Sequence, residues 1–309
     1  MIAMNDLQNI YIIGAGAIGK TLAVALRLEN RKVYLLRGSV DDGLTETRTL
    51  QVIPETGDTI EAAVEVSSFS QFSELNGVIV LTNKSYGNRR LAETLRQKAG
   101  NSPLVLLQNG LEVEQPFIEL DYPAVYRCVL FVTAQTVSEN AVRFKPVSVS
   151  PIGIVRGTVA GLHEVVSLLD SARFQFKADN DIETIVWKKA IINCAFNSVC
   201  PLLDIDNGIF HRNEAALGIA NRIITECMAI AREKGIHLDA GEVEQNLLRI
   251  SRSSDGQLIS TLQDIKNGRE TEIDTLNLAI ARMAKGLGME EAVRETALLG
   301  ELTKIKSGL

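Results

Sequence analysis

A lysine and two asparagines lie on one side of a helix predicted in the second half of this 309-residue sequence. Lys189, Asn193 and Asn197 are four residues apart, so they form a stripe about 80° wide on an otherwise apolar helix. A lysine can polarise a carbonyl group and donate a proton, and asparagines can bind hydroxyl and carboxylate groups. We call these three residues the polar stripe and expect it to line a cleft. The alternative is a solvated helix face, where Glu, Lys and Gln are more usual than asparagine.

A glycine-rich motif near the N-terminus predicts a phosphate-binding turn. It reads GAGAIG and lies between a predicted strand and a predicted helix. In a Rossmann-type unit the first glycine allows a tight turn, the second lets the backbone approach a pyrophosphate, and the third allows close packing of helix on sheet. The free N–H groups at the helix start then face the anion. The motif therefore predicts dinucleotide binding by Gly14, Gly16, Ala17, Ile18 and Gly19.

The end of the next predicted strand indicates which dinucleotide is bound. Sites that prefer NAD place Asp or Glu there to bind the ribose 2′-hydroxyl. Here the acid is absent, and Arg37 follows Leu36. A guanidinium can bind a 2′-phosphate through two N–H groups, so we predict NADP(H) as the cofactor. The alternative is a solvated arginine at a strand end.

Two further polar residues follow predicted buried strands. Lys84 comes after the strand at 78–82, and Asn109 comes after the strand at 104–107. Ligands of parallel sheets bind at the carboxyl edge of the strands, where both residues are expected to lie.

A carboxylate is predicted at the start of a helix near the C-terminus. Gly268 ends one helical pattern, and Glu272 lies in the first turn of the next, predicted at 271–287. The helix dipole stabilises a carboxylate at that position. Glu272 can therefore face the same cleft as the polar stripe.

The elements that would carry these residues divide the chain into two parts. The first half alternates short β-rich runs with helical patterns, which is typical of βαβ units. The predicted strands are 9–13, 32–36, 78–82, 104–107, 125–132, 141–144 and 147–150. The predicted helices of this half are 17–29, 88–98, 112–120 and 161–171.

After residue 182 the β-branched runs disappear and only helical periodicity is left. The fold class is therefore α/β, with a Rossmann-type NADP-binding domain over 1–180 and an all-helical substrate and catalytic domain over 181–309. Gly235 and Gly268 occupy positions typical of helix ends, and Pro201 is expected to end the first helix. The predicted helices are 183–199, 214–234, 241–251, 257–267, 271–287 and 290–304.

Composition restricts the partners. The sequence has 32 Lys and Arg against 38 Asp and Glu, a net charge of −6, and no basic cluster. These features argue against nucleic acid or an anionic membrane as the partner, but not against a small anion. No apolar run approaches the roughly 20 residues that cross a bilayer, and nothing near the N-terminus directs export. Four cysteines without a CxxC pair fit the reducing cytoplasm, and three scattered histidines make a metal site improbable.

Together these residues resemble the ketopantoate reductase (2-dehydropantoate 2-reductase) family over nearly the whole chain. The resemblance includes the GAGAIG turn, the arginine, the Asn109-Gly110 pair, a WxKxxxNxxxN helix and an SxLQDI…TEID segment. It implies that Lys189 is the catalytic lysine and Glu272 its carboxylate partner. It also implies that the substrate is held by Asn109, Asn193, Asn197 and Ser260, and that Lys84, Asn109 and Glu272 lie near the cofactor.

The resemblance implies NADPH-dependent reduction of the 2-oxo acid 2-dehydropantoate to (R)-pantoate, a step toward pantothenate and coenzyme A. Lys189 would be the general acid; burial would lower the pKa of its ammonium group, and Glu272 would oppose that shift. One alternative is a reductase of another branched or aromatic 2-oxo acid, and another is a non-catalytic NADP-binding sensor. A helical second domain is compatible with a homodimer, although the sequence does not fix the oligomeric state.

Overall fold

The computed structural model describes residues 8–38 and 41–309, and the chain divides into two compact units. The first unit runs to Gln108 and resumes over Val113–Ile182. The second comprises Asn109–Glu112 and Glu183–Leu309, so a short segment of the first half belongs to it. The predicted fold class is confirmed: an α/β Rossmann-type unit is followed by a helical one.

The first unit is built on one sheet, which has eleven strands among the described residues, in the order β11-β10-β7-β6-β5-β1-β2-β4-β3-β9-β8. Strands β7, β6, β5, β1, β2 and β4 run parallel at its centre. The strands are β1 (Asn9–Ile13), β2 (Lys32–Leu36), β3 (Thr45–Pro54), β4 (Ile60–Ser67), β5 (Val78–Leu81), β6 (Leu104–Leu106), β7 (Val125–Cys128), β8 (Val132–Thr136), β9 (Ala141–Pro146), β10 (Ser150–Arg156) and β11 (Phe176–Ala178).

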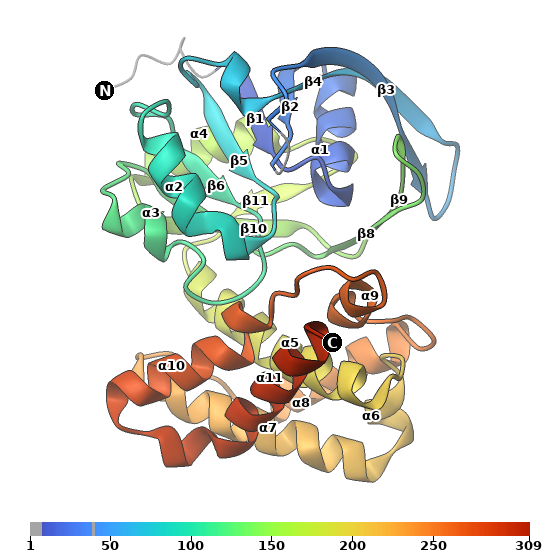
Figure 1. Cartoon of the computed structure of the whole chain (residues 1–309), viewed down its shortest axis with the longest axis vertical. Helices are drawn as coiled ribbons and strands as arrows, with labels where there is room; N and C mark the ends of the chain where they lie inside the picture. The colour runs from blue at the N-terminus through green and yellow to red at the C-terminus, as the bar shows by residue number, and fades with distance from the viewer. Residues whose placement is uncertain (1–7, 39–40) are drawn as a thin grey trace. The chain divides into compact units, whose positions relative to one another are not determined.

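Helices cover both faces of this sheet (Figure 1). On β1, Ile10 and Ile12 pack into one core with α1 (Ala17–Leu28) and α4 (Val159–Leu169). The alternate residues of β1 pack into a second core with α2 (Asn88–Arg96) and α3 (Gln115–Glu119). Because the strand is buried on both faces, it reads as a continuous apolar run. Short 3-10 turns occur at Phe69–Gln71 (η1) and Ser85–Gly87 (η2).

The sequence did not predict β3 and β4, which form an antiparallel pair from Thr45↔Ser67 to Val52↔Ile60. Most residues of β3 are exposed or half-buried, and many are charged or hydroxylated, so no apolar run marks the strand. The predicted strand at 125–132 was also wrong, because two strands, β7 and β8, occupy that stretch and its continuation. The strand predicted at 147–150 was misplaced, since β10 begins only at Ser150.

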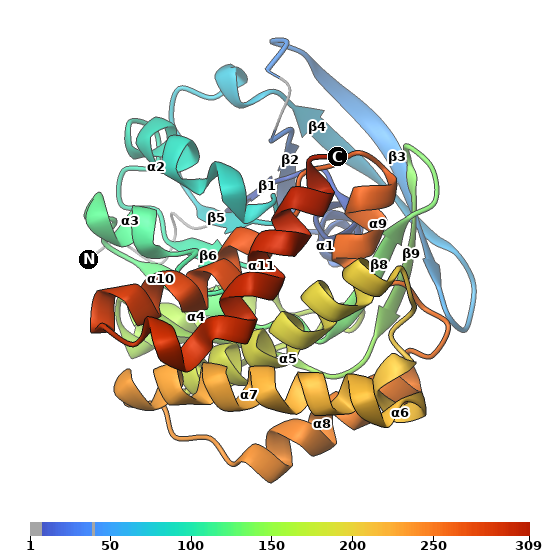
Figure 2. The same cartoon turned by 60° about the horizontal axis from the view of Figure 1, so that its bottom comes forward.

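The second unit is helical and is packed around α5 (Ile182–Leu203), whose residues Ile191, Cys194 and Ala195 are fully buried. In Figure 2, α7 runs alongside α8 next to α5. The remaining helices are α6 (Ile209–Arg212), α7 (Glu214–Glu233), α8 (Ala240–Ser253), α9 (Ser260–Lys266), η3 (Ile273–Thr275), α10 (Asn277–Leu287), η4 (Glu290–Val293) and α11 (Arg294–Ser307).

Several helix boundaries differ from the prediction, two of them for a clear local reason. Pro201 does not stop α5 but lies inside its last turn, where a missing N–H removes only one hydrogen bond near the helix end. The helix predicted at 271–287 is interrupted at Leu276, whose φ of −115° and ψ of −108° are not helical, so α10 starts at Asn277. By contrast, Gly235 and Gly268 adopt positive φ just after α7 and α9, as predicted.

Within the described ranges 8–38 and 41–309, no helix combines the length and the hydropathy that a membrane span requires.

Candidate active site

The glycine motif forms a tight turn between β1 and α1, and its three glycines meet different surroundings. Gly14 has a φ of +117°, and a Cβ there would lie 2.5 Å from the backbone nitrogen of Asn83. A Cβ on Gly19 would lie 2.0 Å from the carbonyl oxygen of Gly14. A Cβ on Gly16 would have no heavy atom within 4 Å. Gly14 and Gly19 are therefore required by packing, whereas Gly16 faces open space in which a ligand can approach the backbone.

The N-terminus of α1 is suited to an anion. Gly16 is its N-cap and provides no side-chain cap, and the first turn contains no acidic residue. Side chains cap other helices of the chain, as Thr158 does for α4 and Asp239 does for α8. The first N–H groups of α1 therefore receive no side-chain cap from Gly16. They form the positive end of the helix dipole, which attracts anions. Ala17 and Ile18, both half-buried, supply the first helical residues.

The backbone of Arg37 lies next to this turn, because the N–H of Gly14 donates to the carbonyl of the preceding residue, Leu36, at 2.9 Å. Its side chain is 15% exposed and is engaged by two carboxylates, so it is not a freely solvated arginine. Its guanidinium donates hydrogen bonds to Asp42 Oδ1 (3.0 Å), Glu46 Oε1 (2.6 Å), the Leu44 carbonyl (3.2 Å) and Ser68 Oγ (3.3 Å).

The loop after β5 is tied to the glycine turn and to the loop after β6. Thr82 Oγ1 donates to the carbonyl of Gly14 at 2.8 Å. The buried amides of Asn88 and Gln108 exchange two hydrogen bonds of 2.8 Å, and Gln108 also donates to the carbonyl of Asn83. These bonds fix the segment that carries Lys84, which directly precedes η2. Sequence reasoning missed Asn88, whose only signal is an amide at the start of a predicted helix.

An unsatisfied acceptor lies in the same loop. Asn83 Oδ1 is buried and has no hydrogen-bond partner in the described part of the chain. A buried polar atom without a partner costs free energy, so a ligand hydroxyl or amide can stabilise it. With the open space at Gly16 and the uncapped start of α1, this atom shows that the residues present fit a dinucleotide.

The polar stripe lies on α5, and its last residue is more buried than the first two. Lys189 and Asn193 are half-buried, and Asn197 is only 3% exposed. The Asn197 amide donates to the Asn193 carbonyl at 3.0 Å, and its oxygen accepts from Thr261 Oγ1 at 2.7 Å and from Ser260 Oγ at 3.4 Å. The structure therefore brings together Asn197 and Ser260, the first residue of α9. It also adds Thr261, which the sequence analysis missed although a Ser-Thr pair opens this helix.

Glu272 is buried and precedes η3 rather than an α-helix. The expectation that it lies in the first turn of a long helix was wrong, because the helical conformation is interrupted at Leu276. The three residues of 3-10 helix before that point have only a small dipole. Thr275 connects it to the segment containing Asn109. Thr275 Oγ1 donates to the Glu272 carbonyl at 3.0 Å, and the Thr275 carbonyl accepts from the N–H of Leu111 at 2.7 Å. The pairing of Glu272 with Lys189 stays a prediction.

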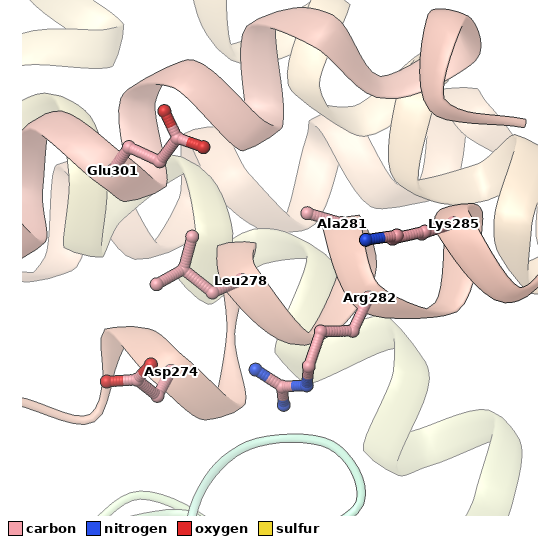
Figure 3. A pocket seen from close by; sticks show the side chains of 6 residues that line it. All are labelled: Asp274, Leu278, Ala281, Arg282, Lys285 and Glu301. Carbon is pink, nitrogen blue, oxygen red and sulfur yellow. The ribbon is translucent and has the colours of Figure 1, made fainter.

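A separate surface pocket lies between α10 and α11 (Figure 3). Leu278 and Ala281 provide apolar lining, and charged side chains surround them. Its lining contains none of the predicted site residues, although Asp274 is two residues from Glu272. The lining residues are Asp274, Leu278, Ala281, Arg282, Lys285 and Glu301.

Two family models match the chain. Residues 10–151 match the model described as ketopantoate reductase PanE/ApbA, and residues 181–304 match the model of the C-terminal part of the same family. The chain belongs to the ketopantoate reductase family. This family consists of oxidoreductases, and the resemblance inferred from the motifs is confirmed.

Individual relatives agree with this assignment. The chain is 26% identical over 305 residues to a 2-dehydropantoate 2-reductase of Pyrococcus abyssi, covering 98% of this chain and 99% of that protein. Solved structures share the fold. D-mandelate dehydrogenase with NADH is 22% identical, has a TM-score of 0.81 and covers 97% of this chain and 98% of its own. A dimeric ketopantoate reductase from Staphylococcus aureus is 16% identical, has a TM-score of 0.79 and has the same coverage.

Proposed function

We propose that this chain reduces 2-dehydropantoate to (R)-pantoate with NADPH. The observation that carries the proposal is the match of both halves to the ketopantoate reductase family, with a lysine and amides in line on a buried helix. The Pyrococcus abyssi relative, named 2-dehydropantoate 2-reductase, matches almost end to end at 26% identity. (R)-Pantoate would then be passed on toward pantothenate and coenzyme A.

The first unit supplies the dinucleotide half-site, by which we mean the glycine turn with Arg37 and Lys84. The nicotinamide dinucleotide supplies a hydride for the carbonyl carbon of the substrate. The open backbone at Gly16 and the uncapped N–H groups of α1 suit a pyrophosphate. Arg37 is the candidate ligand of the 2′-phosphate, and Lys84 is a second cation at the carboxyl edge of the sheet.

The polar stripe would supply the proton and orient the substrate. As hydride reaches the carbonyl carbon, its oxygen becomes negative, and Lys189 Nζ would stabilise that charge and then donate a proton. Asn193, whose side-chain amide has no partner among the described residues, and the exposed Ser260 can bind the substrate's carboxylate and hydroxyl groups. Asn197 would act mainly by holding Ser260 in place, because its amide is already engaged. Glu272 would orient the Lys189 ammonium, and Asn109 would contact both substrate and cofactor.

A second candidate is a reductase of another branched or aromatic 2-oxo acid. It is favoured by the likeness to D-mandelate dehydrogenase, whose named substrate carries an aromatic ring. The test is NADPH oxidation followed spectrophotometrically with 2-dehydropantoate, 2-oxoisovalerate and phenylglyoxylate. We expect the highest kcat/KM for 2-dehydropantoate, whereas a higher value for phenylglyoxylate would support the second candidate. NADPH binding without oxidation by any of these acids would instead indicate a sensor.

We also propose that the enzyme is a homodimer, because the similar ketopantoate reductase from Staphylococcus aureus is described as dimeric. Light scattering on the purified chain tests this directly, with an expected mass of twice 33.7 kDa.

A further inference from the structure

Arg37 is held by carboxylates at the position where a 2′-phosphate ligand is needed. Its Nη1 lies 3.0 Å from Asp42 Oδ1, and its Nη2 lies 2.6 Å from Glu46 Oε1. We call Arg37, Asp42 and Glu46 the Arg37 cluster. Glu46 is itself shared, because Arg48 Nη2 lies 2.6 Å from the same oxygen. Both terminal nitrogens of the guanidinium, which would bind phosphate oxygens, are therefore already bound to acceptors of this chain.

Both carboxylates of the cluster are held in their ionised form. The hydroxyl of Ser68 and the N–H of Leu44 donate to Asp42, and these bonds, together with the charge of Arg37, lower the pKa of that carboxyl. The guanidinium of Arg48, and after it that of Arg37, lowers the pKa of Glu46. Near neutral pH the cluster thus contains two negative charges around one arginine, and a phosphate dianion must displace them or be repelled.

We propose that Asp42 and Glu46 compete with the 2′-phosphate of NADPH for Arg37 and thereby keep the preference of this chain for NADPH over NADH small. NADH carries a hydroxyl in place of the phosphate and does not require the carboxylates to leave. A carboxylate is the group that binds this hydroxyl in NAD-preferring Rossmann folds. The exposed fractions of the two acids, 37% and 43%, leave them accessible to a ligand. The inference rests on the proposed function only in taking the glycine turn as a nicotinamide dinucleotide site.

The test is the dissociation constant of each reduced dinucleotide, measured from nicotinamide fluorescence with no 2-oxo acid present. For the wild-type chain we expect the two constants to differ by less than about tenfold, because NADPH must displace Asp42 and Glu46 from Arg37 whereas NADH need not. Glu46→Gln should tighten NADPH binding about threefold to fivefold and change NADH binding less than about twofold. The double variant Asp42→Asn, Glu46→Gln should raise the NADPH preference by about tenfold.

Asp41→Asn is the matched control. It removes the same charge one residue from Asp42, but Asp41 accepts hydrogen bonds from the N–H and hydroxyl of Ser70 and not from Arg37. We expect no change in the NADPH preference. An equal effect of Asp41→Asn and Asp42→Asn would overturn competition in favour of general charge repulsion.

Arg37→Ala completes a double-mutant cycle. If the carboxylates act by competing for the guanidinium, Glu46→Gln should lose most of its effect on NADPH binding in the Arg37→Ala background. An undiminished effect there, or tightening of both dinucleotides alike, overturns the proposal. Thermal melting of each variant shows that it is folded. Failure of the chain to reduce any 2-oxo acid would overturn the proposed function but leave these binding ratios measurable.

Discussion

The dinucleotide half-site and the polar stripe use polar residues in opposite ways. Around Arg37 the interactions are between full charges, the partners are partly exposed, and Glu46 is shared between two arginines. Around Asn197 the interactions are between neutral amides and hydroxyls, and the residue is 3% exposed in an apolar core. Exposed charge pairs are worth little and can exchange partners, whereas a buried amide that loses its partner is costly. The first region is therefore suited to adjusting ligand preference and the second to fixing geometry.

The largest effect is expected at the one charged member of the stripe. Lys189→Ala should lower kcat/KM about 10²-fold to 10⁴-fold, because it removes the general acid, while NADPH binding is kept. The matched control is Lys188→Ala on the same helix, whose ammonium is 2.6 Å from Glu242. Steady-state kinetics should show less than about a twofold change for this control. Near-normal turnover by Lys189→Ala would contradict the mechanism.

Next in size are two glycine substitutions that separate folding from binding in the dinucleotide half-site. Gly14→Ala places a Cβ 2.5 Å from backbone at a φ of +117°, so it should destabilise the chain by more than about 1 kcal/mol and lower the Tm. A Cβ on Gly16 meets no heavy atom within 4 Å, so Gly16→Ala should leave the Tm unchanged, yet weaken dinucleotide binding about tenfold or more by blocking the pyrophosphate. Calorimetry and fluorescence titration measure the two effects. Normal dinucleotide binding by Gly16→Ala would show that the pyrophosphate does not bind at this turn.

A smaller effect is expected where a hydroxyl fixes the stripe. Thr261→Val removes the 2.7 Å hydrogen bond to Asn197 Oδ1, which is worth about 1 kcal/mol. Since Ser260 donates to the same Asn197 oxygen at 3.4 Å, a less firmly held Asn197 should raise the KM for the 2-oxo acid about fivefold while NADPH affinity is unchanged. Thr225→Val is the control, because that exposed hydroxyl donates only to a carbonyl of its own helix. If both variants raise KM equally, Asn197 does not position the substrate site through Thr261.

The smallest effect tests whether a second arginine cluster is purely structural. Arg212 binds Asp206 at 2.8 Å and lowers the pKa of that carboxyl from 3.8 to about 2. The folded pKa is below the unfolded value, so this stabilisation is present above about pH 4 and is lost as the pH falls toward 2. After allowance for solvent screening it amounts to about 1 kcal/mol.

Asp206→Asn should therefore make the free energy of unfolding depend less on pH below about pH 4. Unlike substitutions in the Arg37 cluster, it should not change the NADPH preference. Urea unfolding at pH 6 and pH 3 measures the difference. An equal loss of stability between these pH values in wild type and variant would refute the assignment.

Much of the candidate site was predictable because its signals are local. The glycine motif fixes a turn and a helix start within six residues, and the spacing of Lys189, Asn193 and Asn197 fixes one side of α5. Predictions were poorer where no apolar run marks a strand. Strands β3 and β4 form a hairpin whose paired residues are 8 to 22 positions apart, and their outer faces are polar, so neither shows a local pattern.

The sequence by itself determined the division into an α/β part and a helical part, the glycine turn and the residue types of the stripe, because short-range sterics and helical periodicity dictate these features. Only the tertiary structure decided the environment of each side chain. It brought Glu46 to Arg37 and Thr261 to Asn197 and grouped Asn109–Glu112 with the helical unit. Charges and hydrogen bonds act over a few ångströms in space whatever the separation along the chain, so their pairing is set only when the chain is folded.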